Sequence, residues 1–190
     1  EVVSLMIETL HTVGLKDISI DLGHVGIFRS LVSITELDDQ QEAILFDMLQ
    51  RKSIPELEVY LSELDLPENL RAQFNQLALL NGDIKILQEA RQIFKGCHQE
   101  WEEARDRIQS VIEVVQDKYP GTLINCDLAE LRGYNYHTGL VFAAFLPGQG
   151  KEIARGGRYD NIGAIFGNAR PATGFSADLL NLHQLSDIPQ

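Results

Sequence analysis

The strongest constraint on the fold is a strand-turn-strand pattern in the last third of the chain. The run Val141–Leu146 is apolar and aromatic, which is typical of a buried strand. Pro147-Gly148-Gln149-Gly150 then turns the chain, which returns through Ile153 and Ala154. This pattern predicts a β-hairpin.

Polar residues flank the predicted hairpin on both sides. Arg132, Tyr136 and His137 lie at the start of its first strand, and the residues that leave its second strand are Gly156, Gly157, Arg158 and Tyr159. Antiparallel pairing would bring the two groups to the same end of the hairpin. Such an end offers charged and hydrogen-bonding side chains, which suits the binding of a small zwitterion.

The first part of the chain predicts a helix followed by a strand. Apolar residues at helical spacing indicate a helix over Val2–Val13 that ends at Gly14. Period-two alternation then predicts a strand at Ile18–Leu22, and the apolar run continues to Phe28. We interpret His24, within this run, as a hydrogen-bonded core residue rather than a ligand.

The sequence pattern changes in residues 36–95, where helical signals dominate and predict a small helical insertion between strands. Thr35 with Asp38 resembles a capping box, and Ser53 with Glu56 repeats this pattern. Acidic residues dominate the first half of the insertion. Its outer faces are either solubilising surface or a docking surface for a partner.

Two more apolar helical stripes complete this insertion. One follows Pro67, and the next follows Asn81-Gly82-Asp83, which we interpret as a break between helices. A longer helix over Trp101–Val115 then leads back to the sheet.

The remaining elements are predicted strands and one helix. Strands are expected at Thr122–Leu128 and at Arg170–Phe175, followed by a helix over Asp178–Leu185. The prediction is a mixed α/β domain whose strands are mostly antiparallel.

Length and charge limit the function further. The 190 residues, 44% of them hydrophobic, are enough for one large domain or a domain with an insertion. Lysine and arginine number 16 against 28 acidic residues, and the net charge of −12 opposes general binding to a polyanion such as tRNA. Arg155, Arg158 and Arg170 are close in sequence, so they are either a local phosphate or carboxylate site or a solvated surface.

Cysteine usage and hydropathy give expectations about metals and location. Cys97 and Cys126 do not have metal-ligand spacing, so we expect free thiols, no metal and no cofactor. No apolar run approaches the roughly 18 residues of a membrane helix. We therefore expect a cytoplasmic protein that does not contact a membrane.

Three segments carry a resemblance to a known family. RGYNYHTGLVF and ARGGRYD resemble the two histidine-recognition segments of the histidyl-tRNA synthetase family, in the same order. Pro171–Phe175 is similar to the run into the third class II motif of that family. The longer segments AELRGYNYHTGLVFAAF, IARGGRYDNIG and ARPATGFSADL most resemble those of a synthetase-like paralogous group, the regulatory subunits of ATP phosphoribosyltransferase.

The resemblance implies a fold and partners. It implies an α+β class II synthetase-like domain, with a mostly antiparallel sheet flanked by helices, of which residues 1–190 are a part that lacks the first two motifs. It also implies a non-catalytic subunit that acts in the first step of histidine biosynthesis. Such a subunit would associate with the catalytic transferase chain and with itself, take histidine as a feedback effector and bind no tRNA.

The resemblance also assigns roles to site residues. Arg132 would clamp the ligand carboxylate, because a guanidinium donates to two oxygens at once. Tyr159 would face the imidazole, and Gly156 and Gly157 would allow close backbone approach. Tyr136, His137 and Arg158 belong to the same two segments. In the alternative interpretation, Arg132 pairs with Glu130 and the glycines only form a turn.

The chain departs from the synthetase pattern at four positions. His137 replaces a second imidazole-facing tyrosine, and Asn135 replaces an acidic residue. In the third motif, Asn181 stands where a catalytic synthetase has an arginine for ATP phosphates, and Asp178 adds a negative charge. Adenylation is therefore disfavoured. A working synthetase core and a scaffold with an empty pocket remain the alternatives to a histidine-sensing subunit.

Overall fold

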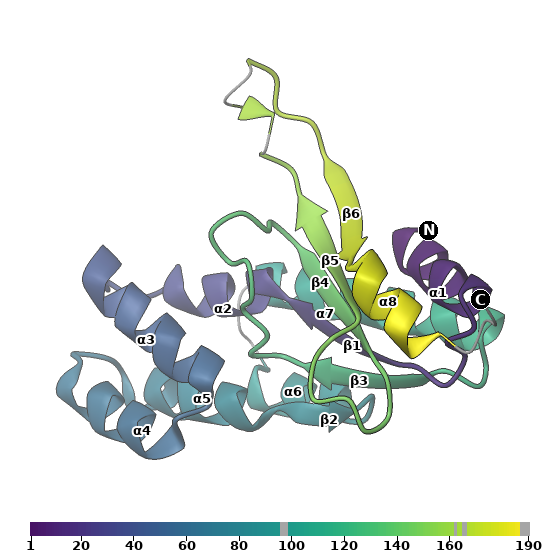
Figure 1. The fold of residues 1–190 in the computed structure, drawn as a ribbon. Helices are drawn as coiled ribbons and strands as arrows, with labels where there is room; N and C mark the ends of the chain where they lie inside the picture. Colours follow the sequence, from purple (N-terminus) through teal and green to yellow (C-terminus); the bar gives the residue numbers. More distant parts are fainter. Residues whose placement is uncertain (96–98, 162, 165–166, 187–190) are drawn as a thin grey trace.

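A single mixed sheet organises the molecule (Figure 1). The computed structural model describes residues 1–95, 99–161, 163–164 and 167–186. In these residues the strand order is β2-β3-β1-β4-β5-β6, and β1 and β3 are the parallel pair in an otherwise antiparallel sheet. The strands are β1 (Ser19–His24), β2 (Asn81–Asp83), β3 (Leu123–Asp127), β4 (Leu140–Phe145), β5 (Ala154–Tyr159) and β6 (Ala172–Ala177). The predicted mixed fold and the β4–β5 hairpin are confirmed.

The helices form two groups around this sheet. α7 packs on β1 and β4, and α1 contacts β6, whereas α3 to α6 gather at the side of the sheet that ends in β2 (Figure 1). The helices are α1 (Val2–Thr12), α2 (Val25–Val32), α3 (Asp39–Arg51), α4 (Ile54–Glu63), α5 (Glu68–Leu79), α6 (Ile86–Ile93), α7 (Gln99–Lys118) and α8 (Leu179–Leu185). The predicted helices after Pro67 and before Pro120 are confirmed.

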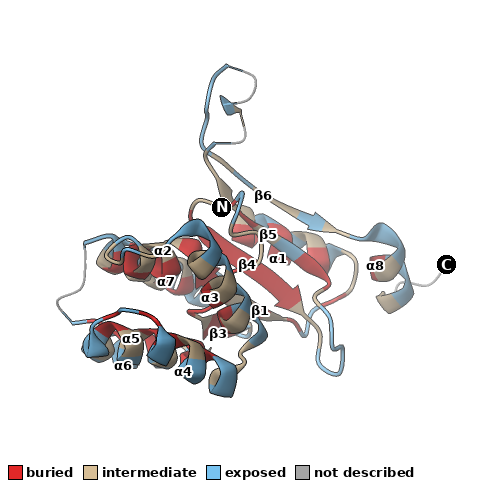
Figure 2. Cartoon of the chain, turned by 90° about the vertical axis from the view of Figure 1, so that its left-hand side faces the viewer, coloured by how far each residue is buried: buried red, intermediate tan, exposed pale blue. Residues whose placement is uncertain are grey.

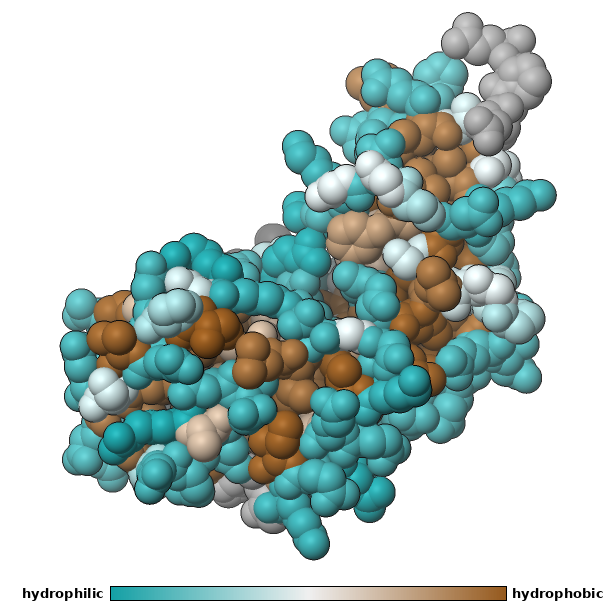
Figure 3. Space-filling view, turned by 90° about the horizontal axis from the view of Figure 1, so that it is seen from below, coloured by the Kyte–Doolittle hydropathy of each residue, from teal (hydrophilic) through white to brown (hydrophobic). Residues whose placement is uncertain are grey.

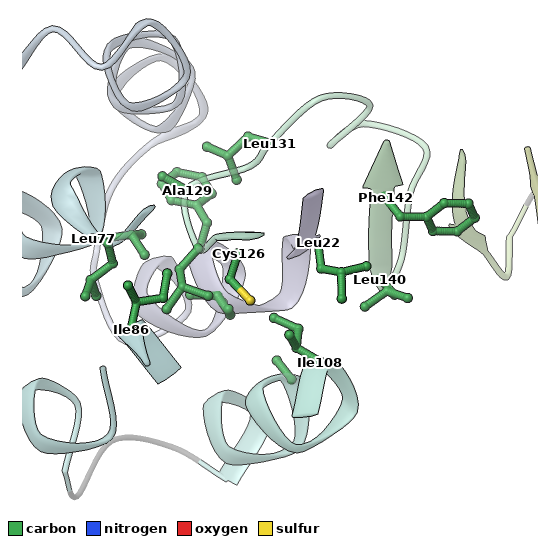
Figure 4. Packing of buried hydrophobic residues seen from close by; sticks show 14 of the residues in the cluster. Leu22, Leu77, Ile86, Ile108, Cys126, Ala129, Leu131, Leu140 and Phe142 are labelled. Atoms are coloured by element: carbon green, nitrogen blue, oxygen red, sulfur yellow. The ribbon is translucent and has the colours of Figure 1, made fainter. Parts of the chain in front are cut away.

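Strand alternation separates the core from the opposite face of the sheet. Leu22 and Cys126 point toward Ile108 of α7 (Figure 4), and all three are almost fully buried. Buried residues concentrate in the central strands and on the helix sides that face them (Figure 2). Because successive residues of a strand point to opposite faces, Asp21 and Gly23 lie on the face away from α7.

The strand predicted at Ile18–Leu22 corresponds to β1, but the apolar run that continues to Phe28 is not all strand. β1 ends at His24, and Val25–Val32 is the helix α2. The His24 side chain caps this helix, because its Nδ1 accepts a hydrogen bond from the Gly26 amide at 3.1 Å. His24 is thus hydrogen-bonded, as predicted, but as a helix cap, which is how the apolar run changes from strand to helix.

The predicted cap at Thr35 is wrong by three residues. Asp38 is the N-cap of α3 and forms a capping box with Gln41, while the Thr35 hydroxyl donates to the Val32 carbonyl at the end of α2. Ser53 is the N-cap of α4, as predicted, but its side chain makes no capping bond. Its predicted partner, Glu56, instead accepts from Arg51 at 3.2 Å.

Two predictions about the sheet are also corrected. Asn81–Asp83 is more than a break between helices, because it forms the short strand β2 and pairs with β3. Gly156 to Tyr159 do not follow the second hairpin strand but lie within β5. The segment predicted as a helical insertion therefore also contributes an edge strand to the sheet.

One face of the molecule shows how polar and apolar residues are distributed on its surface. Hydrophilic residues predominate on the face shown in Figure 3, with hydrophobic patches among them. None of the described helices has the length and apolar character needed to span a bilayer. Cys97, predicted to be a free thiol, lies outside the described residues; Cys126 is buried in β3 with a free thiol, as predicted.

Candidate functional site

A cavity of about 400 Å³ lies over the sheet face opposite α7. The strand register arranges its floor in two rows. One row contains Asp21, Ala143, Arg155 and Ser176, which are direct partners across β1, β4, β5 and β6. The next row contains Val141, Gly157 and Gly174, and it continues on β1 at Gly23, which does not itself line the cavity. A row with two charges thus lies beside a row made mostly of glycine.

The glycine row gives room to side chains from above the sheet. A Cβ at Gly157 would overlap Nδ1 and Cε1 of the His137 ring, and a Cβ at Gly174 would lie 2.6 Å from the Tyr159 hydroxyl. A Cβ at Gly23 would lie 2.6 Å from Cβ of Glu130. Any side chain at these three positions would displace a group that borders the cavity, so glycine is required for packing here.

The loop between β3 and β4 carries Arg132, Tyr136 and His137, and Tyr134 anchors it. The Arg29 guanidinium donates to the Tyr134 carbonyl at 2.6 Å and lies 4.6 Å from its ring centroid. The Tyr134 hydroxyl donates to Glu42 of α3 at 2.6 Å. Burial, assisted by Glu42, raises the pKa of the Tyr134 hydroxyl. The loop is therefore fastened to both α2 and α3.

Arg132 takes part in a network of ion pairs. Its Nε and Nη2 donate to Glu130, and its Nη1 donates to Glu152 at 3.0 Å. These bonds to Glu130 raise the pKa of Arg132, although partial burial opposes this. Glu152 also accepts from Arg155 at 3.2 Å. The pairing of Arg132 with Glu130, which the sequence offered as an alternative to a carboxylate clamp, is thus present.

His137 is the most enclosed of the predicted site residues with side chains. Its exposed fraction is 7%, and its ring lies 4.5 Å from that of Tyr136 and 6.0 Å from that of Tyr159. Its Nδ1 is buried with no hydrogen-bond partner in the described part of the chain. Burial and the nearby Arg29 lower the pKa of the His137 imidazole, against an opposing effect of Glu130.

Six of the seven predicted site residues line this cavity, and Arg158 does not. The six are Arg132, Tyr136, His137, Gly156, Gly157 and Tyr159. Arg158 follows Gly157 on the strand and points to the other face, where it borders a second cavity of about 830 Å³. Its Nε donates to Asp160 at 3.0 Å. Arg158 is therefore separated from the other six predicted site residues by the sheet.

The same alternation divides the arginines that could have formed one basic patch. Arg155 lines the first cavity and Arg158 the second, while Arg170 is exposed in the segment before β6. These three side chains therefore do not form a common phosphate site.

Several cavity residues were not predicted to contact a ligand. Asp21 reaches the cavity from β1, and Gln50 reaches it from the end of α3. Glu130 was considered only as a partner of Arg132, yet it also borders the cavity. The period-two pattern could have placed Asp21 on the polar face of its strand, but no local signal indicates Gln50. The cavity has two carboxylates, Asp21 and Glu130, and two guanidinium groups, Arg132 and Arg155.

The end of the third-motif segment has a structural role. Asp178 is the N-cap of α8, and its Oδ1 accepts from the amides of Leu180 and Asn181 at 2.9 and 3.1 Å. Asn181 and Arg155 line a shallow hollow beside the first cavity. The Asp178 carboxylate thus satisfies the first amides of the helix, and Asn181 places a neutral side chain there.

Sequence comparisons relate the chain to synthetase-like proteins. The family model described as histidyl-tRNA synthetase matches residues 1–182. A protein of Thioalkalivibrio sulfidiphilus named ATP phosphoribosyltransferase regulatory subunit is 49% identical over 100% of this chain and 48% of its own length. A protein of the same name from Methylococcus capsulatus is 47% identical over 99% of this chain and 46% of its own length. The chain spans about half the length of the curated relatives it matches.

Solved structures show the same fold. A Bacillus halodurans protein described as an ATP phosphoribosyltransferase regulatory subunit/histidyl-tRNA synthetase has a TM-score of 0.85 and 25% identity, over 98% of this chain and 48% of its own. Histidyl-tRNA synthetase from Nostoc has a TM-score of 0.76 and 18% identity, over 96% of this chain and 44% of its own. The sheet and its helices are therefore those of class II synthetase-like proteins.

Proposed function

We propose that this chain, which belongs to the histidyl-tRNA synthetase family, is part of a non-catalytic regulatory subunit of ATP phosphoribosyltransferase. In this role it binds free histidine and associates with the catalytic transferase chain. The names of relatives at 49% and 47% identity support the assignment. The observation that supports histidine as the ligand is the first cavity, whose lining combines charges of both signs with aromatic side chains, among them the buried His137.

The cavity chemistry matches the groups of an amino acid. Arg132 is the carboxylate clamp, because a guanidinium presents parallel N–H donors to two oxygens. Asp21 and Glu130 offer acceptors for the ammonium group. The imidazole lies against His137 and Tyr159, whose polar atoms match its one donor and one acceptor. A volume of about 400 Å³ is in the range of small-molecule sites.

Histidine binding regulates the transferase through linkage. If histidine binds more tightly to one arrangement of the two subunits, it shifts the population toward that arrangement. Feedback inhibition follows when the favoured arrangement is the less active one. This mechanism needs no chemistry in the cavity itself.

Adenylation is not the function of the site. Stabilisation of a triphosphate in the transition state needs fixed positive charge. Asn181 is neutral, and the nearby Asp178 is an anion that is already engaged as the cap of α8. A histidyl-tRNA synthetase core is the competing function.

The test uses the full-length protein together with the short catalytic transferase chain. We expect the two to co-purify, and added histidine to inhibit the transferase activity of the complex. Calorimetric titration of the full-length protein with histidine should show saturable binding. ATP–pyrophosphate exchange dependent on histidine would establish the synthetase alternative. Absence of both histidine binding and exchange would leave only a structural scaffold.

A further inference from the structure

His137 differs in kind from the tyrosine that its position resembles in the synthetase. Its ring packs directly on the β5 backbone, since a Cβ at Gly157 would overlap it. On its other side, a Cβ at Gly133 would lie 2.9 Å from Cδ2. The ring is thus held between two glycines, which fixes the direction of both nitrogens.

The two ring nitrogens have unequal surroundings. Nδ1 faces the strand and is buried without a hydrogen-bond partner among the described residues. A Cα hydrogen of Gly157 points at Nδ1, because a Cβ built in its place would overlap that atom. A hydrogen on Nδ1 would collide with it, whereas the lone pair of an unprotonated Nδ1 can accept a weak C–H contact there. The imidazole therefore carries its proton on Nε2. The imidazolium form is disfavoured for the same reason, because it would also protonate Nδ1.

Nε2–H is consequently a donor at the cavity wall. No hydrogen bond joins Nε2 to another group in the described part of the chain, and His137 borders the cavity. The ring centroids of Tyr136 and Tyr159 lie 4.5 and 6.0 Å from that of His137. A planar ligand ring between these groups would meet one N–H donor.

We infer that His137 determines ligand specificity by donating its Nε2–H to an acceptor nitrogen of an aromatic ligand side chain, which selects an un-ionised imidazole. This inference rests on the proposed function, because it takes histidine as the ligand of the cavity. A phenylalanine side chain would leave the donor unpaired. A lysine or arginine side chain would place only N–H donors against the Nε2–H donor, so no hydrogen bond could form.

The test compares amino acids that differ in one ring atom. The full-length protein is titrated calorimetrically with L-histidine, with thienylalanine, which has no ring nitrogen, and with 4-thiazolylalanine and 5-thiazolylalanine. The ring nitrogen of the 4-isomer matches imidazole Nδ1, and that of the 5-isomer matches Nε2. We expect one thiazolylalanine isomer to bind roughly 10-fold to 100-fold more tightly than thienylalanine, because only it satisfies the donor. Equal affinities in the wild-type protein would overturn the inference.

Matched variants assign the donor to His137. His137→Phe retains an aromatic ring and should abolish the difference between thiazolylalanine and thienylalanine, whereas His137→Gln retains an N–H donor and should preserve it. Tyr159→Phe is the control for the nearby hydroxyl and should also preserve it. A difference that persists in a folded His137→Phe protein would reject the role of His137. If wild-type protein fails to bind histidine but still separates the two analogues, the proposed function fails and the donor role stands.

Discussion

Replacing Gly157 with alanine tests the site with one methyl group. In the folded structure this Cβ would overlap Nδ1 and Cε1 of His137 and would lie 3.1 Å from its Cγ. The ring cannot move away freely, because Gly133 and Tyr136 enclose its other side. Overpacking of this kind costs about 1–3 kcal/mol. We expect Gly157→Ala to lower the free energy of unfolding by that amount and to weaken histidine binding by roughly 10-fold or more through the displaced imidazole.

The assay is urea unfolding and calorimetric histidine titration of the full-length protein. Gly121→Ala is the matched control, since its Cβ would meet no atom within 4 Å. The control should leave both the urea midpoint and the histidine affinity unchanged. If Gly157→Ala matched the control in both measurements, His137 would not be held against β5 as described.

Three further predictions concern charge and burial. Burial, with Arg107, Arg29 and Arg158, lowers the pKa of His24 from 6.5 to about 4. The unfolded chain therefore binds the extra proton first, and the free energy of unfolding should fall by up to about 3 kcal/mol between pH 6.5 and pH 4. His24→Asn keeps a capping oxygen and should remove this loss, as measured by urea midpoints at both ends of the range; an unchanged pH profile would contradict the assignment. Arg132→Ala should abolish inhibition of the transferase by histidine and leave the circular dichroism spectrum native, whereas unchanged inhibition would refute the clamp. Burial raises the pKa of the Cys126 thiol to about 12, and the negative charges of Asp21 and neighbouring acids add to this effect. Treatment with a thiol reagent at pH 8, followed by peptide mapping, should therefore find Cys126 modified only in urea. Modification of Cys126 in the native protein would contradict its burial.

Elements that depend on local periodicity could be predicted from the sequence. The hairpin of β4 and β5 follows from an apolar run, a glycine-rich turn and a return strand. The α7 helix follows from one apolar stripe that ends before Pro120. In both cases burial of a single face or strand determines the structure, and each pattern extends far enough to show its period.

Boundaries set by one polar side chain could not be predicted in the same way. The apolar residues around His24 fit a strand or a helix, and the imidazole cap decides between them. Near α3, both Thr35 and Asp38 are suitable caps, and Asp38 is used because Gln41 completes the reciprocal bonds. The competing residues satisfy the same local rule, so only the surrounding structure selects one.

The site shows the same division between local and long-range information. Once β5 includes Gly157, Arg158 and Tyr159, alternation alone sends Arg158 to the opposite face. The sequence analysis ended the second hairpin strand before Gly156 and therefore grouped Arg158 with Gly157 and Tyr159. Asp21 and Gln50 reach the cavity through strand pairing and helix packing over long separations, which no local pattern encodes.

The two sequence interpretations of Arg132 are chemically compatible. A guanidinium has five N–H donors, and the bonds to Glu130 and Glu152 do not use all of those on its two Nη atoms. The side chain of Glu130 is only 14% exposed, so its pair with Arg132 is held in place by the surrounding packing. An arginine fixed in this way loses little conformational entropy when a carboxylate arrives. Under the proposed function, pairing with Glu130 therefore preorganises the clamp rather than replacing it, and the same carboxylate remains available to an incoming ammonium group.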